Sequence, residues 1–212
     1  MLMAPYRKKT ALRPAGNTGF SLLEVLVTIV ILLIGLLGLA GLQARALSSQ
    51  MESYQRSQAL ILLQDMASRI NANRKNASSY VTPVPQYLGT GTSYSIPTDC
   101  TTAAAGQPRD FCEWNNALLG AAETQGVANN VGAMIGARGC IYQTLAPASG
   151  VVAIYSIVVA WQGLNNTAAP IVVTTPPSPA NCGLGLYKDR SGATQEALHR
   201  VVTLPIGIAD LN

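Results

Sequence analysis

The chain of 212 residues is long enough for one ordinary domain plus an additional segment, and too short for two large domains with separate cores. Only 11% of its residues are charged and 49% are hydrophobic, which excludes an extended disordered polyelectrolyte. The formal charge of +4 belongs to the first nineteen residues, because four basic side chains lie there and no acid precedes Glu24. The remainder balances ten basic against ten acidic residues, so nucleic acid is not an expected partner.

Residues 20–42 form an apolar run whose only ionisable side chain is Glu24. At a rise of about 1.5 Å per residue the run is roughly 34 Å long, and it has no polar face. These properties predict a single transmembrane helix rather than the core helix of a soluble domain. Because the basic residues precede the run, residues 1–19 are expected in the cytoplasm and everything after Leu42 across the membrane.

Three glycines, Gly35, Gly38 and Gly41, recur at three-residue intervals in the second half of this run. Each costs a helix about 1 kcal/mol relative to alanine, so their presence needs a reason. We predict that they allow close packing against another helix, since small residues let two backbones approach. Local melting of the helix is the alternative interpretation.

Residues 43–75 contain no proline or glycine and are predicted to continue the helix as an amphipathic segment. A helix over residues 21–73 would be roughly 80 Å long. Asp65 and Arg69 are spaced to form an i,i+4 ion pair. A coiled-coil dimer is disfavoured because the apolar stripe is too short for sustained heptads. The stripe consists of Ala59, Leu62, Leu63, Met66 and Ile70, opposite Arg56, Gln64 and Ser68.

Residues 76–212 are richer in Gly, Pro, Ser, Thr and Asn and are predicted to form an α+β head. The pattern Asp110-Phe111-Cys112-Glu113 resembles a helix cap and predicts a short helix that ends near Glu123. Alternating apolar residues predict a small antiparallel sheet, and a surface loop is expected near Cys182. The expected strands are residues 139–143, 151–161, 170–175 and 200–208.

Four cysteines, Cys100, Cys112, Cys140 and Cys182, lie in the translocated part, where an oxidising compartment would join them as two disulfides. Three pairings are possible, and we favour Cys100 with Cys112 and Cys140 with Cys182. A zinc site is disfavoured, since no CxxC pair occurs and His199 is the only histidine. His199 is expected on the surface of a strand, and no catalytic residue, metal or cofactor is expected.

The junction before the apolar run carries the most specific motif of the chain. The run Gly19-Phe20-Ser21-Leu22-Leu23-Glu24-Val25-Leu26 resembles the class III signal of type IV prepilins. In that family a prepilin peptidase cuts after the glycine and methylates the new terminal amine. The resemblance implies cleavage between Gly19 and Phe20, with Phe20 becoming the N-methylated first residue.

The chemistry of Glu24 agrees with this interpretation. A carboxylate within a bilayer costs about 2.5–3.5 kcal/mol on insertion scales, so it needs a cationic partner or a proton. Cleavage would release the amine of Phe20 at the same depth, and the Glu24 of one subunit is expected to pair with the amine of its neighbour. The alternative is a protonated or snorkelling Glu24 tied only to its own terminus.

The chain also resembles a narrower family, the PilV-like minor pilins. The resemblance implies a type IV pilin-like α+β fold, in which the long helix packs on a small antiparallel sheet with two disulfides. It further implies a low-abundance pilin that helps prime fibre assembly, lies near the fibre tip and supports twitching motility or adhesion. The matching segments are residues 62–73, Cys112 with Trp114 and Leu118, residues 139–141, 155–164 and 200–211.

The implied partners are the prepilin peptidase, major and other minor pilins, and the inner-membrane assembly platform. The expected location is the bacterial inner membrane, with a periplasmic head, and then the pilus. A minor pseudopilin of a type II secretion system is the nearest alternative. A single-pass inner-membrane sensor or ligand-binding protein is an alternative from another class.

Overall fold

The computed structural model describes residues 19–121, 124–125, 129–130, 134–146, 152–173 and 177–209. The chain divides into two compact units, Met1–Ala46 and Leu47–Asn212. The first helix, α1 (Leu22–Ala72), begins in the first unit and ends in the second.

In the first unit, α1 starts directly after Ser21, whose hydroxyl oxygen accepts the backbone N–H of Leu23 at 3.3 Å. The backbone stays helical through Gly35, Gly38 and Gly41, where an added Cβ would meet no other atom within 4 Å. The predicted helix is therefore confirmed, and the space beside its three glycines is open among the described residues.

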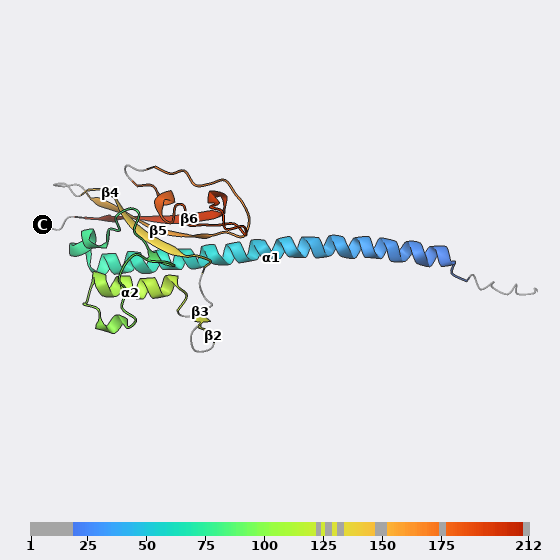
Figure 1. Cartoon of the computed structure of the whole chain (residues 1–212), viewed down its shortest axis with the longest axis horizontal. Helices are drawn as coiled ribbons and strands as arrows, with labels where there is room; N and C mark the ends of the chain where they lie inside the picture. The colour runs from blue at the N-terminus through green and yellow to red at the C-terminus, as the bar shows by residue number, and fades with distance from the viewer. Residues whose placement is uncertain are drawn as a thin grey trace, which may run out of the picture. The chain divides into compact units, whose positions relative to one another are not determined.

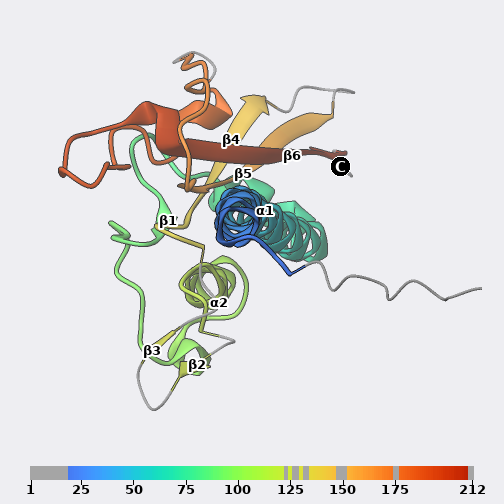
Figure 2. The same cartoon turned by 90° about the vertical axis from the view of Figure 1, so that its right-hand side faces the viewer.

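In the second unit, residues 47–72 of α1 lie between a β-sheet and a second helix, α2 (Gln107–Leu118) (Figures 1 and 2). The sheet is antiparallel, in the order β1-β4-β5-β6. Its strands are β1 (Leu88–Gly89), β4 (Arg138–Leu145), β5 (Ala153–Gln162) and β6 (His199–Ile208), and a separate two-stranded sheet joins β2 (Thr124–Gln125) and β3 (Asn129–Asn130).

The main core fills the space between the sheet, α1 and α2. The predicted stripe of α1 is confirmed: four of its members are buried and Leu62 is partly buried against the same core. Burial of such a stripe supplies most of the stability of an amphipathic helix. The largest buried side chains of this core include Leu63, Met66, Ile70, Tyr80, Leu88, Trp114, Leu118, Ile141 and Ile157.

A smaller core lies on the opposite face of the sheet, where the segment between β5 and β6 covers Cys140, Tyr142 and Val158. The disulfide Cys140–Cys182 fastens that segment to β4. A second disulfide, Cys100–Cys112, joins the short 3₁₀ helix η2 (Cys100–Thr102) to α2. Both pairings are those favoured from the sequence, and the α+β fold class with two disulfides is confirmed.

Two local predictions of the fold differ from the structure, and one strand was not predicted. Residues 170–173 form no strand, and residues 174–175 lie outside the described residues. The backbone N–H of Val173 donates to Ser178 Oγ at 2.9 Å, so a local turn rather than a neighbouring strand satisfies it. The strand that was not predicted is β1, whose two residues pair with β4 and carry no strand pattern of their own.

The predicted cap at Asp110 is wrong, because α2 begins earlier, at Gln107, with Gly106 as its N-cap and Pro108 in its first turn. Gly106 has a φ of 87°, a conformation that glycine adopts readily. The helix ends at Leu118 and is followed by Gly120 at a φ of 72°, whereas Glu123, its predicted end, lies outside the described residues.

Candidate assembly site

The junction between Gly19 and Phe20 lies in non-helical backbone just before α1. The Phe20 side chain is 85% exposed. A protease needs its substrate in an extended form, and no helical hydrogen bond would have to break at this bond. The leader itself, residues 1–18, lies outside the described residues.

Glu24 occupies the first turn of α1, where a negative charge interacts favourably with the helix dipole. Its side chain is exposed, and its carboxylate has no hydrogen-bond or ion-pair partner among the described residues. Ser21 and Glu24 also have the spacing of a capping box. A cation that pairs with this carboxylate must come from the chain's own terminus or from another molecule.

The apolar surface around Glu24 is unburied. Among the described residues, one helix, α1, is long and apolar enough to cross a membrane by length and composition. An exposed apolar surface of this extent requires lipid or other protein around it. Its largest exposed members include Phe20, Leu22, Leu23, Leu26, Ile31, Leu32, Ile34, Leu36, Leu37 and Leu42.

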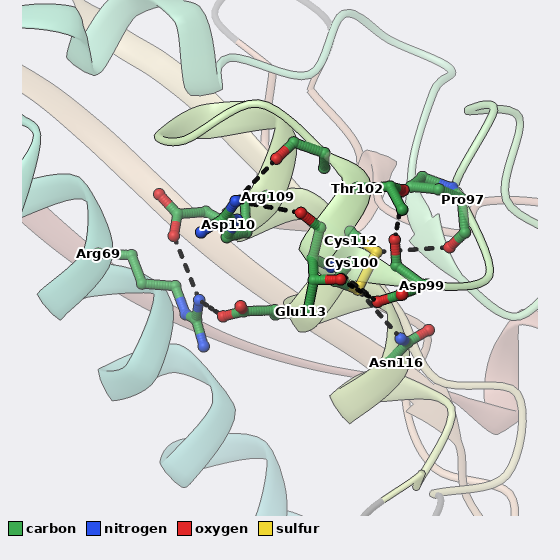
Figure 3. Close-up of a disulfide and its surroundings, with 12 residues drawn as sticks. Arg69, Pro97, Asp99, Cys100, Thr102, Arg109, Asp110, Cys112, Glu113 and Asn116 are labelled. Atoms are coloured by element: carbon green, nitrogen blue, oxygen red, sulfur yellow. Dashed lines mark hydrogen bonds and ion pairs between the residues drawn. A yellow bond between two sulfur atoms is a disulfide. The ribbon is translucent and has the colours of Figure 1, made fainter.

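In the second unit an ionic cluster fastens α2 to α1, and Figure 3 shows Arg69 reaching from α1 toward two acids of α2. The Arg69 guanidinium lies 3.0 Å from Asp65 Oδ2, 3.2 Å from Asp110 Oδ1 and 2.5 Å from Glu113 Oε2. The predicted Asp65–Arg69 pair is thus confirmed and is part of a larger network. Burial opposes the Arg69 charge, but the surrounding carboxylates, led by Glu113, raise its pKa above its usual value.

Tyr80 completes this cluster, because its hydroxyl donates to Asp110 Oδ2 and accepts from Asn73 Nδ2 at 3.1 Å. Burial and the bond to Asp110 raise the pKa of Tyr80 to about 12. The 3₁₀ helix η1 (Arg74–Tyr80) follows α1 in the chain. Asp110, which was predicted to cap α2, therefore links α2 both to α1 and to η1.

The Cys100–Cys112 disulfide holds the loop before α2, as Figure 3 shows. Asp99 caps η2 by accepting the backbone N–H of Thr101 at 2.9 Å, and Arg109 Nη2 donates to the carbonyl oxygen of Ala103 at 3.0 Å. These bonds orient the loop that leads into α2.

A second polar contact fastens the sheet to α1. Oε1 of Glu52 accepts the backbone N–H groups of Leu164 and Asn165, at 3.2 and 3.3 Å, and a guanidinium N–H of Arg200 at 3.2 Å. Sequence reasoning missed this contact, because the helical spacing of Glu52 suggests Arg56 as its partner. Only the fold brings Arg200, 148 residues away, to Glu52.

His199 is buried, with 1% of its surface exposed, and its predicted place on the surface of a strand is wrong. Both faces of the sheet are covered where β6 begins. The ring stacks on Tyr187 with centroids 4.7 Å apart, and its Nδ1 lies 3.0 Å from Glu196 Oε2. Burial lowers the pKa of His199, and the positive charge of Arg138 lowers it further. The carboxylate of Glu196 raises this pKa but does not outweigh the effect of burial.

Arg138 is a further buried group that the sequence did not indicate. Its guanidinium lies over the rings of Tyr87 and Tyr187, 5.2 and 5.0 Å from their centroids. Such cation–π contacts stabilise a cation that has little access to water. No local pattern could have found this group, because the two tyrosines are distant in the sequence.

Within the described ranges, no group of three His, Cys, Asp or Glu side chains is placed to hold a metal ion. All four cysteines are engaged in disulfides.

Comparison with protein families gives two matches. Residues 41–117 match the family model described as Type IV pilin Tt1218. Residues 15–40 match the Prokaryotic N-terminal methylation motif, which includes Gly19, Phe20 and Glu24. Searches among curated proteins and solved structures gave no significant match.

The two matches and the architecture define an α+β pilin fold and support a type IV pilin. The methylation motif implies processing by prepilin peptidase and assembly with other pilins. The apolar part of α1 fits a membrane-anchored pilin that enters the pilus.

Proposed function

We propose that this chain is a minor pilin of the type IV pilus. It is cleaved between Gly19 and Phe20, N-methylated at Phe20, and held in the inner membrane by residues 20–42. The basic leader favours a cytoplasmic N-terminus and a periplasmic head. The pilin primes fibre assembly and is incorporated near the tip.

The observation that carries this proposal is the Glu24 carboxylate, which has no partner among the described residues and lies in the first turn of an exposed apolar helix, directly after a Gly-Phe junction. A soluble protein gains nothing from this arrangement, and a simple membrane anchor would avoid the carboxylate. In a stack of cleaved subunits, the amine of one Phe20 neutralises the Glu24 of the next. Gly35, Gly38 and Gly41 leave gaps among the large side chains of the helix surface, and an added Cβ there would meet nothing within 4 Å, which suits close packing between neighbouring spans.

The assignment to the minor class is supported by the resemblance of the second half to PilV-like minor pilins. A pilin acts as a structural subunit, so no reaction is proposed. Twitching motility and adhesion are the expected cellular roles.

Glu24→Gln tests the assembly mechanism, with Thr28→Val as the matched control. Thr28 is one turn further along α1, and its hydroxyl is already bonded to the carbonyl of Val25 at 2.8 Å. A hydrogen bond to a charged group is worth about 1.5–3 kcal/mol, so Glu24→Gln should reduce recovery in sheared fibres about tenfold or more. Thr28→Val should leave recovery unchanged, and both variants should still reach the membrane.

Deletion of the gene separates the cellular alternatives. The proposal predicts loss of surface pili and of twitching, both restored by the wild-type chain. Intact pili with lost exoprotein secretion would instead identify a type II pseudopilin. A chain that remains uncut at Gly19 in the presence of prepilin peptidase would identify a membrane-anchored sensor.

A further inference from the structure

A pocket of about 290 Å³ lies within the second unit, between α1 and β6. Its α1 side consists of Ser49, Glu52, Ser53 and Arg56, which recur at the spacing of one helical face. None of these residues belongs to the apolar stripe that packs in the core.

The opposite wall comes from the sheet. It includes Trp161 at the end of β5, Arg200 near the start of β6, and the adjoining Val201 and Val202. The valines supply an apolar surface beside the charged groups. This combination suits a side chain with a short hydrocarbon stem and a charged end.

Two of the three charged groups in the pocket are already engaged. Glu52 accepts three hydrogen bonds through Oε1, one of them from Arg200. Arg200 also donates to the carbonyl oxygens of Ala197, at 3.0 Å, and Asn165. Arg200 is therefore occupied in holding the loop after β5.

Arg56 is the charged group that remains. It stands four residues after Glu52, the usual spacing for an ion pair on a helix, but Glu52 is turned toward Arg200. Throughout the described segments, no carboxylate forms an ion pair with Arg56, and its side chain is exposed. Its guanidinium can therefore accept an external partner without breaking an existing contact.

The other polar groups that line the pocket are also able to donate hydrogen bonds. Trp161 is 4% exposed, and its indole N–H is buried with no hydrogen-bond partner. The hydroxyls of Ser49 and Ser53 also line the pocket. Arg56 and the indole N–H can only donate, and the serine hydroxyls can donate as well as accept, so the pocket favours a ligand that accepts, and a carboxylate is such a ligand.

The charge balance favours a single negative charge. Two guanidinium groups, Arg56 and Arg200, against the carboxylate of Glu52 leave a net charge of +1. A carboxylate neutralises that charge, whereas a phosphate dianion would overcompensate it beside Glu52.

We propose that this pocket binds an acidic side chain of a neighbouring pilin subunit, with Arg56 as its ion-pair partner. The inference rests on the proposed function, because a neighbouring subunit is available only in a fibre. It adds a specific contact at the head to the contacts expected along the apolar helix.

The first experiment compares Arg56→Glu with Arg56→Lys and the control Arg190→Glu. Arg190 is exposed on a surface turn of the head and does not line the pocket, so its reversal changes the net charge equally without touching the proposed site. The ratio of the chain in sheared fibres to that in membranes is measured for each full-length variant. Arg56→Glu should lower the ratio about tenfold or more, whereas Arg56→Lys and Arg190→Glu should keep it within about twofold.

The second experiment identifies the partner. A carbodiimide joins an amine to a carboxylate only when the two are in contact, so fibres that carry Arg56→Lys are treated with this reagent. Mass spectrometry should find residue 56 joined to an Asp or Glu of another pilin. A link only to Glu52 of the same chain, or no link, would overturn the proposal.

The outcomes distinguish this inference from the proposed function. Absence of the wild-type chain from fibres would refute the proposed function itself. Wild-type recovery of Arg56→Glu, or equal losses for Arg56→Glu and Arg190→Glu, would refute only the pocket. Reduced recovery of Arg56→Glu in membranes, with an unchanged ratio, would indicate a lipid headgroup as ligand and would also overturn the proposal.

Discussion

Gly139→Ala tests the packing of α2 on the sheet. Gly139 lies on β4, and a Cβ added there would meet Trp114 Cη2 and Cζ3 at 2.4 Å and Leu118 Cδ1 at 2.8 Å. Ordinary contacts begin at 3.4 Å, so the Trp114 ring would have to move by about 1 Å. Trp114 is fully buried within the main core.

The expected cost follows from these contacts. Overpacking of a core costs about 1–3 kcal/mol. The indole N–H of Trp114 donates to the carbonyl oxygen of Leu62 at 3.0 Å, and a displacement of about 1 Å would break this bond. Loss of the bond adds about 1 kcal/mol, so Gly139→Ala should destabilise the head by about 2–4 kcal/mol.

Guanidinium denaturation of the full chain in detergent, followed by tryptophan fluorescence, measures this cost. Gly41→Ala is the control, since its Cβ would meet nothing within 4 Å. Trp114→Phe removes the ring atoms that clash with the added Cβ. The double variant with Gly139→Ala should therefore lose at least about 1 kcal/mol less stability than the sum of the losses of the two single variants. Trp161 still reports unfolding in that variant. An unchanged midpoint for Gly139→Ala, or strict additivity, would refute the packing argument.

The two disulfides should differ in their contribution to stability. Cys140 and Cys182 are 42 residues apart and Cys100 and Cys112 are 12 apart, so loop-closure entropy gives about 4 and about 3 kcal/mol respectively. Each disulfide is removed by changing both of its cysteines to serine. The variant without Cys140–Cys182 should have a lower free energy of unfolding than the variant without Cys100–Cys112, and the reverse order would contradict this estimate. The lowered pKa of His199 predicts a pH dependence: the unfolded chain takes up the proton first, so stability should be complete above pH 6.5 and fall as the solution is acidified toward the folded pKa. Denaturation midpoints between pH 7.5 and 5 should therefore fall less for His199→Gln than for the wild type, and parallel slopes would refute this role.

Much of the fold was predictable because its signals are local. The apolar run, the stripe on α1 and the alternation in β5 each reflect one-sided or complete burial, which a short window of sequence records. The cysteine pairing also followed, because one candidate pairing closes a short loop and leaves the other two cysteines to join distant segments.

The remaining features depend on contacts between distant residues. Residues 170–173 have a strand-like composition, but no neighbouring strand is present to receive them, and propensity cannot supply one. His199 is followed by Arg200 and therefore resembles a surface position, yet the segment around Tyr187 covers it. Glu52 likewise binds Arg200 rather than the nearby Arg56.

The residues of the candidate assembly site could be predicted from the sequence, but the contacts that other parts of the fold make around the head could not. Glu24 and the Gly19–Phe20 junction stand out because their chemistry conflicts with the apolar run beside them. The pocket at Arg56 could not be predicted, since it needs both α1 and β6 to form.

Intact-mass analysis and N-terminal sequencing of the chain from sheared fibres test the central claim most directly. The account predicts that the fibre-associated chain begins at Phe20, with one methyl group on its amine, and lacks the nineteen-residue leader. A fibre-associated chain that retains the leader, or a mature chain found only in membranes, would contradict it.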